Sequence, residues 1–306
     1  MKVLIISYGS IGKRHYNILN SLNKNIEISV VSSQTINNSI VYNSIQKAYQ
    51  EHQFNYTIIC SPTSRHYIDL LEVLKFHTIG NPILIEKPVF EKYISKIDLK
   101  SKNIFVGYNL RYHPIINKLR EILKNTKDIN YVNMYVGQYL PNWRPERDYR
   151  ESYSSKKEEG GGVLLDLSHE IDLLHYLFGE IQICNSLVSH QSNLEINSED
   201  VALIHGKTVK NIIFSLSLDY ISKTPIRQIT VHSNSKTYQA DLIQNTLYST
   251  NLNGQKEYEE IKDLDRNHTY TQMHKELIES NFSNICSFED GLKVNYWIDQ
   301  IKKNSI

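Results

Sequence analysis

Short apolar runs alternate with amphipathic stretches in the first part of the chain. Runs typical of buried strands lie at residues 2–6, 26–31, 55–60, 83–85 and 104–109. The clearest helical stripe consists of Ile11, His15, Ile18, Leu19 and Leu22. We also predict helices through Ile68, Leu71 and Leu74, over 90–100 and over 115–124. Successive strand–helix units predict an α/β fold with a doubly wound, mostly parallel sheet.

The pattern changes after Ile129, where strands follow one another with few helices between them. We expect strands at 130–139, 181–190, 199–206, 210–220, 226–233 and 236–250. Helical patterns cover 163–178, 270–280 and 288–301. This order predicts a second, α+β domain with an open, mostly antiparallel sheet. We place the domain boundary between residues 122 and 123, and leave open whether the C-terminal helices pack back on the first domain.

A glycine-containing turn joins the first strand to the first helix. Its sequence is Ser7-Tyr8-Gly9-Ser10-Ile11-Gly12, with a serine where the first glycine of GxGxxG would stand. The amides at such a helix N-terminus bind phosphate groups. Residues 1–122 are therefore predicted to form a dinucleotide-binding Rossmann domain, with Gly9, Ser10, Ile11 and Gly12 at the cofactor.

The second strand ends at Ser32 and Ser33, where an acidic residue would favour NAD by binding the ribose hydroxyls. Without that carboxylate, NADP is slightly favoured, although no arginine nearby in the sequence is available for its 2′-phosphate. Later strand ends add further residues to the predicted cofactor site: Ser61, Pro62, Thr63, His66, Glu86, Lys87 and Asn109. Lys87 belongs to Glu86-Lys87-Pro88, which directly follows a buried strand, and ligands bind at the carboxyl ends of such strands.

Composition narrows the possible partners. The chain has 306 residues, a net charge of +1 and three cysteines far apart in sequence. This predicts neither a nucleic-acid partner nor a metal site. No apolar run approaches the roughly 18 residues of a membrane span, and the first strand begins too early for a signal peptide. We expect a cytoplasmic protein.

Residues 140–150 form a polar loop that contains three arginines. Guanidinium groups match carboxylate and phosphate oxygens, so we predict that Trp143, Arg144, Tyr149 and Arg150 bind an anionic substrate. The alternative is an ordinary solvated basic loop.

Three glycines, 160–162, precede the predicted helix 163–178. We expect them to allow close approach of backbone and ligand. Asp166, His169 and Asp172 follow at a spacing of three, which would place them on one broad helix face. A histidine flanked by two carboxylates is a good candidate for a general base.

These motifs together resemble the Gfo/Idh/MocA family of oxidoreductases, over essentially the whole chain. The segments that carry the resemblance are YGSIGKRH, SPTSRH, EKP, GYNLRYHP and GGGVLLDLSHEIDLLHYLFG. The resemblance implies an active site between the two domains, a cis bond before Pro88, and a homodimer or homotetramer formed through the open sheet.

The resemblance also implies residue roles. Lys87 and His169 match the catalytic lysine and histidine, and Asp166 is the nearest match to the catalytic aspartate, three residues before the histidine where family members commonly have four. Asp172 would hold or polarise His169. We expect Tyr108 and Arg111 to lie, with Asn109, where cofactor and substrate meet.

The predicted reaction is hydride transfer between a nicotinamide and a sugar carbon. The arginine loop joined to the glycine-rich segment resembles family members encoded among surface-glycan genes. A nucleotide sugar or a sialic-acid-like sugar is therefore the favoured substrate. The alternatives are a dehydrogenase of free cyclitols or monosaccharides, and a non-catalytic regulator that binds dinucleotide.

Overall fold

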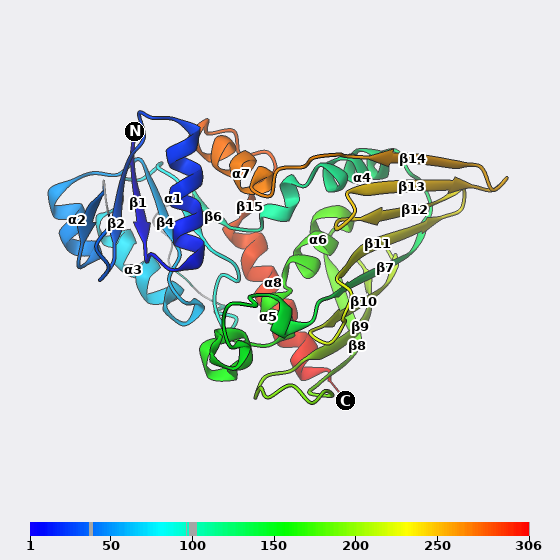
Figure 1. Cartoon of the computed structure of the whole chain (residues 1–306). Helices are drawn as coiled ribbons and strands as arrows, with labels where there is room; N and C mark the ends of the chain where they lie inside the picture. Colours follow the sequence, from blue (N-terminus) through cyan, green and yellow to red (C-terminus); the bar gives the residue numbers. More distant parts are fainter. Residues whose placement is uncertain (37–38, 96, 98–102, 306) are drawn as a thin grey trace. The chain divides into compact units, whose positions relative to one another are not determined.

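The computed structural model describes residues 1–36, 39–95, 97 and 103–305. The chain divides into two compact units, one made of residues 1–109 and 266–295 and the other of 110–265 and 296–306. We describe each unit by itself (Figure 1).

The first unit is built on a seven-stranded sheet with the order β15-β6-β5-β4-β1-β2-β3. All neighbouring strands are parallel except β15 and β6. Its strands are β1 (Lys2–Ile6), β2 (Glu27–Val31), β3 (Ile40–Tyr42), β4 (Tyr56–Ile59), β5 (Ile83–Ile85), β6 (Ile104–Val106) and β15 (Cys286–Ser287). Its helices are α1 (Ser10–Leu22), α2 (Ile45–Glu51), α3 (His66–Phe76) and α7 (His268–Ile278), with the short 3₁₀ turn η1 (Thr63–Arg65).

The central strands of this sheet are mostly apolar because helices cover them. In β1, Val3, Leu4 and Ile5 are completely buried, and in β4 so are Ile58 and Ile59. Strand order reverses at β1, which pairs with β2 on one side and β4 on the other. The predicted doubly wound, mostly parallel sheet is confirmed, and its switch point lies between β1 and β4.

The second unit is built on an eight-stranded sheet with the order β14-β13-β12-β11-β7-β10-β9-β8. Only the pair β7 and β10 is parallel among its paired strands. Its strands are β7 (Ile129–Gly137), β8 (Ile181–Ser189), β9 (Val201–Thr208), β10 (Ile213–Asp219), β11 (Ile226–Ser233), β12 (Lys236–Asp241), β13 (Thr246–Asn251) and β14 (Lys256–Glu260). Its helices are α4 (Pro114–Lys124), α5 (Val163–Asp166) and α6 (His169–Phe178), and α8 (Phe288–Lys303) contributes its last residues.

Short 3₁₀ turns occupy much of the connection from β7 to α5. They are η3 (Leu140–Asn142), η4 (Tyr149–Glu151), η5 (Tyr153–Ser155) and η6 (Lys157–Glu159), and η2 (Asn109–Tyr112) precedes α4.

One face of the second sheet is covered and the other is open. Along β7, Val132, Met134 and Val136 are buried, whereas Asn133 is exposed and Tyr135 is partly exposed. Helices α4, α5 and α6 lie on the covered side (Figure 1). The predicted open, mostly antiparallel sheet is confirmed. Although we expected α4 to close the first domain, it groups with the second unit because it packs on β12 and β13.

Several predicted elements differ from the structure. The predicted strand 236–250 is two strands, because the Asp241 carboxylate accepts the Ile243 and Gln244 amides in a turn that ends at Asn245, where φ is 54°. The predicted helix 90–100 is absent from residues 90–95, and residues 96 and 98–100 lie outside the described residues. Elements β3, α2 and β14 have no counterpart in the sequence prediction.

The predicted helix 163–178 is also two helices. Leu167 leaves the helical region, with φ −98° and ψ 26°, so α5 ends at Asp166 and α6 begins at His169. Asp166, His169 and Asp172 therefore do not share one helix face, and that part of the prediction is wrong.

Candidate functional site

Each unit carries part of the predicted site. In the first unit the predicted cofactor residues gather at the carboxyl ends of β1, β2, β4, β5 and β6, because parallel strands all end at one edge of the sheet. In the second unit the predicted substrate residues lie in the loop 140–155 and around the break between α5 and α6.

The turn after β1 keeps the backbone of a glycine-rich dinucleotide loop. Ser7, where the first glycine would stand, has a φ of 77°, a left-handed conformation that glycine adopts more readily. A Cβ on Gly12 would collide with the Ser7 carbonyl, so the close packing of α1 on the turn requires glycine there. At Gly9 nothing lies within 4 Å of a Cβ position, and Gly9 has no side chain to cap the first turn of α1. These features fit a dinucleotide phosphate at the start of α1.

The other strand ends are tightly interlocked. His66 is 1% exposed, and its two ring nitrogens lie 2.8 Å from the Ser61 carbonyl and 3.0 Å from the Pro88 carbonyl. Burial lowers the pKa of His66 below its ordinary value. His66 thus links the loop after β4 to the loop after β5, a structural contact that the sequence did not indicate.

The residues that directly follow β5 and β6 are buried, with Lys87 as a partly exposed exception after β5. From Pro82 to Phe90 every residue is buried except Lys87, which is partly exposed. The bond between Lys87 and Pro88 is cis, as the resemblance implied. Tyr108 and Asn109 are buried, and the Asn109 amide donates to the Thr269 hydroxyl over 2.6 Å.

At the end of β2, Ser32 lies in a turn in which its hydroxyl accepts the Gln34 amide over 3.0 Å, and Ser33 is exposed. No carboxylate appears at this strand end in the sequence.

The glycines before α5 pack against the protein itself. A Cβ on Gly161 would collide with the carbonyls of residues 153, 154 and 156, and one on Gly162 would meet the Glu199 carboxylate. The Val163 amide donates to the Glu199 carbonyl over 3.0 Å. Close approach of loop and helix therefore accounts for Gly161 and Gly162, where we had expected approach by a ligand.

Asp166 ends α5 beside two tyrosines. It is 5% exposed, and its Oδ2 accepts the Tyr220 hydroxyl over 2.7 Å. Its charge is the main cause that raises the pKa of Tyr153 well above the ordinary value, with a hydrogen bond between the two side chains. Burial, and then the Asp166 charge, raise the pKa of Tyr220. The sequence analysis singled out neither tyrosine. Tyr220 is 54 positions from Asp166 in sequence, and Tyr153 lies outside the motif that contains Asp166.

His169, the first residue of α6, shows the same contrast as Lys87. Every residue from Gly160 to Leu174 is buried except His169, which is partly exposed. Three residues further on, the Asp172 carboxylate binds the Arg111 guanidinium, with Nη2 to Oδ1 at 2.6 Å and Nε to Oδ2 at 3.0 Å. Arg111 is 3% exposed, and its guanidinium stacks 4.6 Å from the Tyr176 ring centre.

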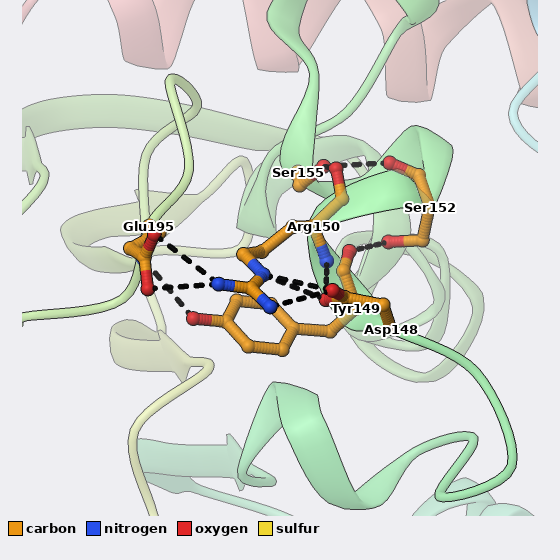
Figure 2. A network of polar contacts seen from close by, with 6 residues as sticks. All are labelled: Asp148, Tyr149, Arg150, Ser152, Ser155 and Glu195. Atoms are coloured by element: carbon orange, nitrogen blue, oxygen red, sulfur yellow. Dashed lines mark hydrogen bonds and ion pairs between the residues drawn. The ribbon is translucent and has the colours of Figure 1, made fainter.

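The loop 140–155 contains two distinct features, a hydrogen-bonded cluster around Arg150 and a pocket. Arg150 donates from Nε and Nη2 to Asp148 and from Nη1 to Glu195, as Figure 2 shows. In the same cluster the Tyr149 hydroxyl accepts the Glu195 amide over 3.2 Å, and the Ser152 and Ser155 hydroxyls donate to loop carbonyls. These contacts hold the loop in shape, and the Asp148 carboxylate raises the pKa of Arg150.

The second feature of this loop is a pocket of about 350 Å³. It is lined by Leu140, Trp143, Arg144, Glu146, Arg147, Asp148, Tyr149, Glu151, Ser152 and Ser154. Trp143 lies edge-on to Tyr220 at 5.2 Å between ring centres, which connects the pocket wall to the tyrosine that binds Asp166. Arg147, which the sequence analysis did not single out, lines this pocket together with Arg144.

Two candidate features are absent from the described part of the chain. No helix there is long and apolar enough to span a membrane. Among the same residues, no group of three or more His, Cys, Asp or Glu side chains is placed to hold a metal ion.

Comparison with known proteins identifies the family. Residues 120–305 match the model of the Gfo/Idh/MocA oxidoreductase family, C-terminal α/β domain, which is more than half of the chain. The protein therefore belongs to the Gfo/Idh/MocA family of oxidoreductases. No curated protein sequence matches the chain.

Solved structures share the fold at low sequence identity. A UDP-N-acetylglucosamine 3-dehydrogenase from Acidithiobacillus ferrooxidans has 15% identity and a TM-score of 0.74, covering 100% of this chain and 97% of its own. A levoglucosan dehydrogenase solved with NADH and L-sorbose has 14% identity and a TM-score of 0.83, covering 100% and 96%. A super-repressor mutant of Gal80p from Saccharomyces cerevisiae has 13% identity and a TM-score of 0.81, covering 99% and 95%.

Proposed function

We propose that the protein is a nicotinamide-dependent oxidoreductase that interconverts a hydroxyl and a keto group on a sugar. The observation that carries this proposal is the exposure of Lys87 and His169. Each is the single partly exposed residue in an otherwise buried stretch, 82–90 and 160–174 respectively. An amine and an imidazole left accessible within buried segments are suited to proton transfer and hydrogen bonding at a bound substrate.

A nicotinamide dinucleotide, when bound, supplies or accepts the hydride. The turn Ser7–Gly12 and the first turn of α1 would hold its phosphates, and Ser61, Pro62 and Thr63 would border it. The solved dehydrogenase with NADH supports a nicotinamide cofactor. We leave the choice between NAD and NADP open, with NADP slightly favoured by the absence of an acidic residue beside Ser32 and Ser33.

His169 would take the proton of the substrate hydroxyl on oxidation and return it on reduction. Lys87 would donate a hydrogen bond to the same oxygen. Asp166 is held by Tyr220 and would keep its carboxylate near the start of α6, where it stabilises a protonated imidazole.

For the substrate we propose an anionic sugar, such as a nucleotide sugar or a sialic-acid-like sugar used for surface glycans. The pocket with Arg144 and Arg147 supports this class, because guanidinium groups bind phosphate and carboxylate. Arg150 is a weaker candidate than the sequence suggested, since Asp148 and Glu195 occupy its donors. A UDP-sugar dehydrogenase among the similar structures agrees with this class.

We also propose that two copies associate through the open face of the second sheet. Leu187 and Leu203 are register partners on β8 and β9 and are 43% and 39% exposed. On β13 and β14, the exposed rings of Tyr248 and Tyr258 lie 4.7 Å apart between centres. A dimer would bury these side chains, and light scattering after gel filtration would measure its mass.

The test of the enzyme is a cofactor-absorbance assay with NAD, NADP and a panel of UDP-sugars, acidic sugars and free sugars. Lys87→Ala and His169→Ala should each lower kcat by about 100-fold or more while cofactor still binds. Lys24→Ala, an exposed lysine on the first unit, is the matched control and should leave kcat unchanged. Full turnover in both site variants would refute the assignment.

The second candidate function is a non-catalytic regulator that binds dinucleotide, which the structural similarity to Gal80p supports. A regulator would bind dinucleotide with an affinity that Lys87→Ala barely alters, and would turn over no sugar in the panel.

A further inference from the structure

A buried chain of hydrogen bonds runs through the first unit to the residue before Lys87. The Glu86 Oε1 lies 2.9 Å from His15 Nε2, His15 Nδ1 lies 2.8 Å from His274 Nε2, and His274 Nδ1 lies 3.0 Å from the Tyr56 hydroxyl. The four residues come from the end of β5, from α1, from α7 and from β4. His15, His274 and Tyr56 are 0% exposed and Glu86 is 5% exposed.

When Glu86 is ionised, one arrangement of protons fills all three hydrogen bonds with neutral imidazoles. Tyr56 donates to His274, His274 donates to His15, and His15 donates to a Glu86 carboxylate. In the reverse arrangement a protonated Glu86 donates to His15, His15 donates to His274, and the Tyr56 oxygen accepts from His274. Burial lowers the pKa of His274 well below its ordinary value and raises the pKa of Tyr56 well above its own, which keeps both groups neutral. In the first arrangement this hydrogen-bond chain ends on the Glu86 carboxylate, which accepts from His15.

Glu86 is also hydrogen-bonded to the backbone of the next residue, Lys87. Its Oε2 accepts the backbone amide of Lys87 over 3.3 Å. A Cβ on Gly107 would lie only 2.7 Å from Oε1, so the carboxylate is enclosed on that side as well. Other titratable groups near this hydrogen-bond chain are Tyr270, whose ring centre is 5.5 Å from that of His15, Cys60 and His66. The Glu86 charge contributes to the raised pKa of both Tyr270 and Cys60.

We infer that His15 and His274 are positioning residues for Lys87. Through hydrogen bonds they hold Glu86 as a carboxylate in one orientation, and Glu86 in turn fixes the backbone of Lys87 and places a negative charge beside it. This inference rests on the proposed role of Lys87. A buried carboxylate that lost its imidazole donor would take up a proton. The loss of that charge would lower the pKa of the Lys87 amine, because an adjacent negative charge favours the protonated amine.

The experiment compares four variants. His15→Phe keeps the ring volume and removes both hydrogen bonds, and His15→Gln provides an amide that can donate to Glu86 and accept from His274. Glu86→Gln removes the charge and keeps the shape. Tyr49→Phe is the matched control, since it removes a buried hydrogen bond of 2.7 Å to Thr57, whose side chain points to the opposite face of β4 from that of Tyr56.

The first readout is the pKa of Lys87 from pH-dependent acetylation followed by mass spectrometry, which requires no turnover. We expect it to fall in His15→Phe and Glu86→Gln, to return toward wild type in His15→Gln, and to stay unchanged in Tyr49→Phe. The second readout is turnover. We expect kcat to fall by about 10- to 100-fold in His15→Phe, with the Lys87 limb of the pH profile moved to lower pH and cofactor affinity within about twofold.

The double variant with His15→Phe and Glu86→Gln should be no worse than Glu86→Gln alone, because both changes act through one carboxylate. An unchanged Lys87 pKa in His15→Phe and Glu86→Gln would overturn the inference, whatever the turnover. If His15→Phe does not fold, Glu86→Gln carries the same test. Absence of turnover with every sugar in wild type would refute the proposed function, while a lowered Lys87 pKa in the variants would still support the positioning role.

Discussion

The Arg111 guanidinium and the Asp172 carboxylate form a buried, two-pronged ion pair, with atoms 2.6 and 3.0 Å apart. The two residues are 61 positions apart in sequence and are 3% and 1% exposed. Their contact ties η2 to the first turn of α6, which begins at His169. Arg111 thereby fixes the helix that carries the proposed general base.

Removing one partner of this pair should strongly destabilise the protein. Asp172→Ala would leave the Arg111 charge buried without its carboxylate, so we expect the free energy of unfolding to fall by about 3–5 kcal/mol. Urea denaturation would measure it. The double variant with Arg111→Met and Asp172→Leu should be less damaged than Asp172→Ala, since it buries no unpaired charge. A loss below about 1 kcal/mol in Asp172→Ala would contradict the buried pair.

Tyr220→Phe should change the pH dependence of kcat. The change removes the hydroxyl that donates to Asp166 over 2.7 Å, and a carboxylate with one donor fewer is less stabilised in its charged form, so the acidic limb of kcat should move to higher pH. We expect a loss of about 1.5–3 kcal/mol in unfolding free energy, as for hydrogen bonds to charged groups. Tyr135→Phe removes a similar bond of 2.8 Å to Asp219 and should not move the pH profile. An identical profile in Tyr220→Phe and wild type would exclude Asp166 from the reaction.

Substitutions of the arginines in the loop 140–155 should differ in their effect on KM for the sugar substrate. Arg144→Ala and Arg147→Ala should each raise KM for an anionic sugar by about 10-fold or more, through loss of a charge-assisted hydrogen bond. Arg150→Ala should raise KM less, because Asp148 and Glu195 already occupy its guanidinium. Lys156→Ala, at a partly exposed lysine paired with Glu159, is the control. Equal effects of Arg144→Ala and Arg150→Ala would refute this division of the loop.

Stability should fall in mild acid because of buried histidines. Burial lowers the pKa of His274 and His66 in the folded protein, so below pH about 6.5 the unfolded chain binds protons that the folded protein does not. Each contributes at most about 1.4 kcal/mol of lost stability per pH unit below that point, and neither contributes a slope above pH 7. Thermal unfolding from pH 8 to pH 5 would measure the trend.

His274→Gln should flatten this dependence, because a glutamine does not titrate. His205→Gln, at an exposed position on β9, should leave it unchanged. A Tm that is constant between pH 7 and pH 5 in wild type would contradict the lowered pKa values.

The sequence by itself determined both sheets and the family. Apolar runs such as 2–6 and 83–85 are local signals, and a glycine turn between strand and helix fixes its own backbone, so both can be read from neighbouring residues. The candidates Lys87 and His169 were also found from their motifs, and the structure adds that both are partly exposed within buried stretches.

Only the tertiary structure decided which polar groups are already occupied. The donors of Arg150 and Arg111 belong to ion pairs with Asp148, Glu195 and Asp172, and no sequence pattern gives the partner of a side chain. The same holds for the chain from Tyr56 through His274 and His15 to Glu86, whose members are up to 259 residues apart in sequence. Hydrophobic periodicity records which face of an element is buried, whereas a hydrogen bond depends on distances of about 3 Å that only the packed elements set.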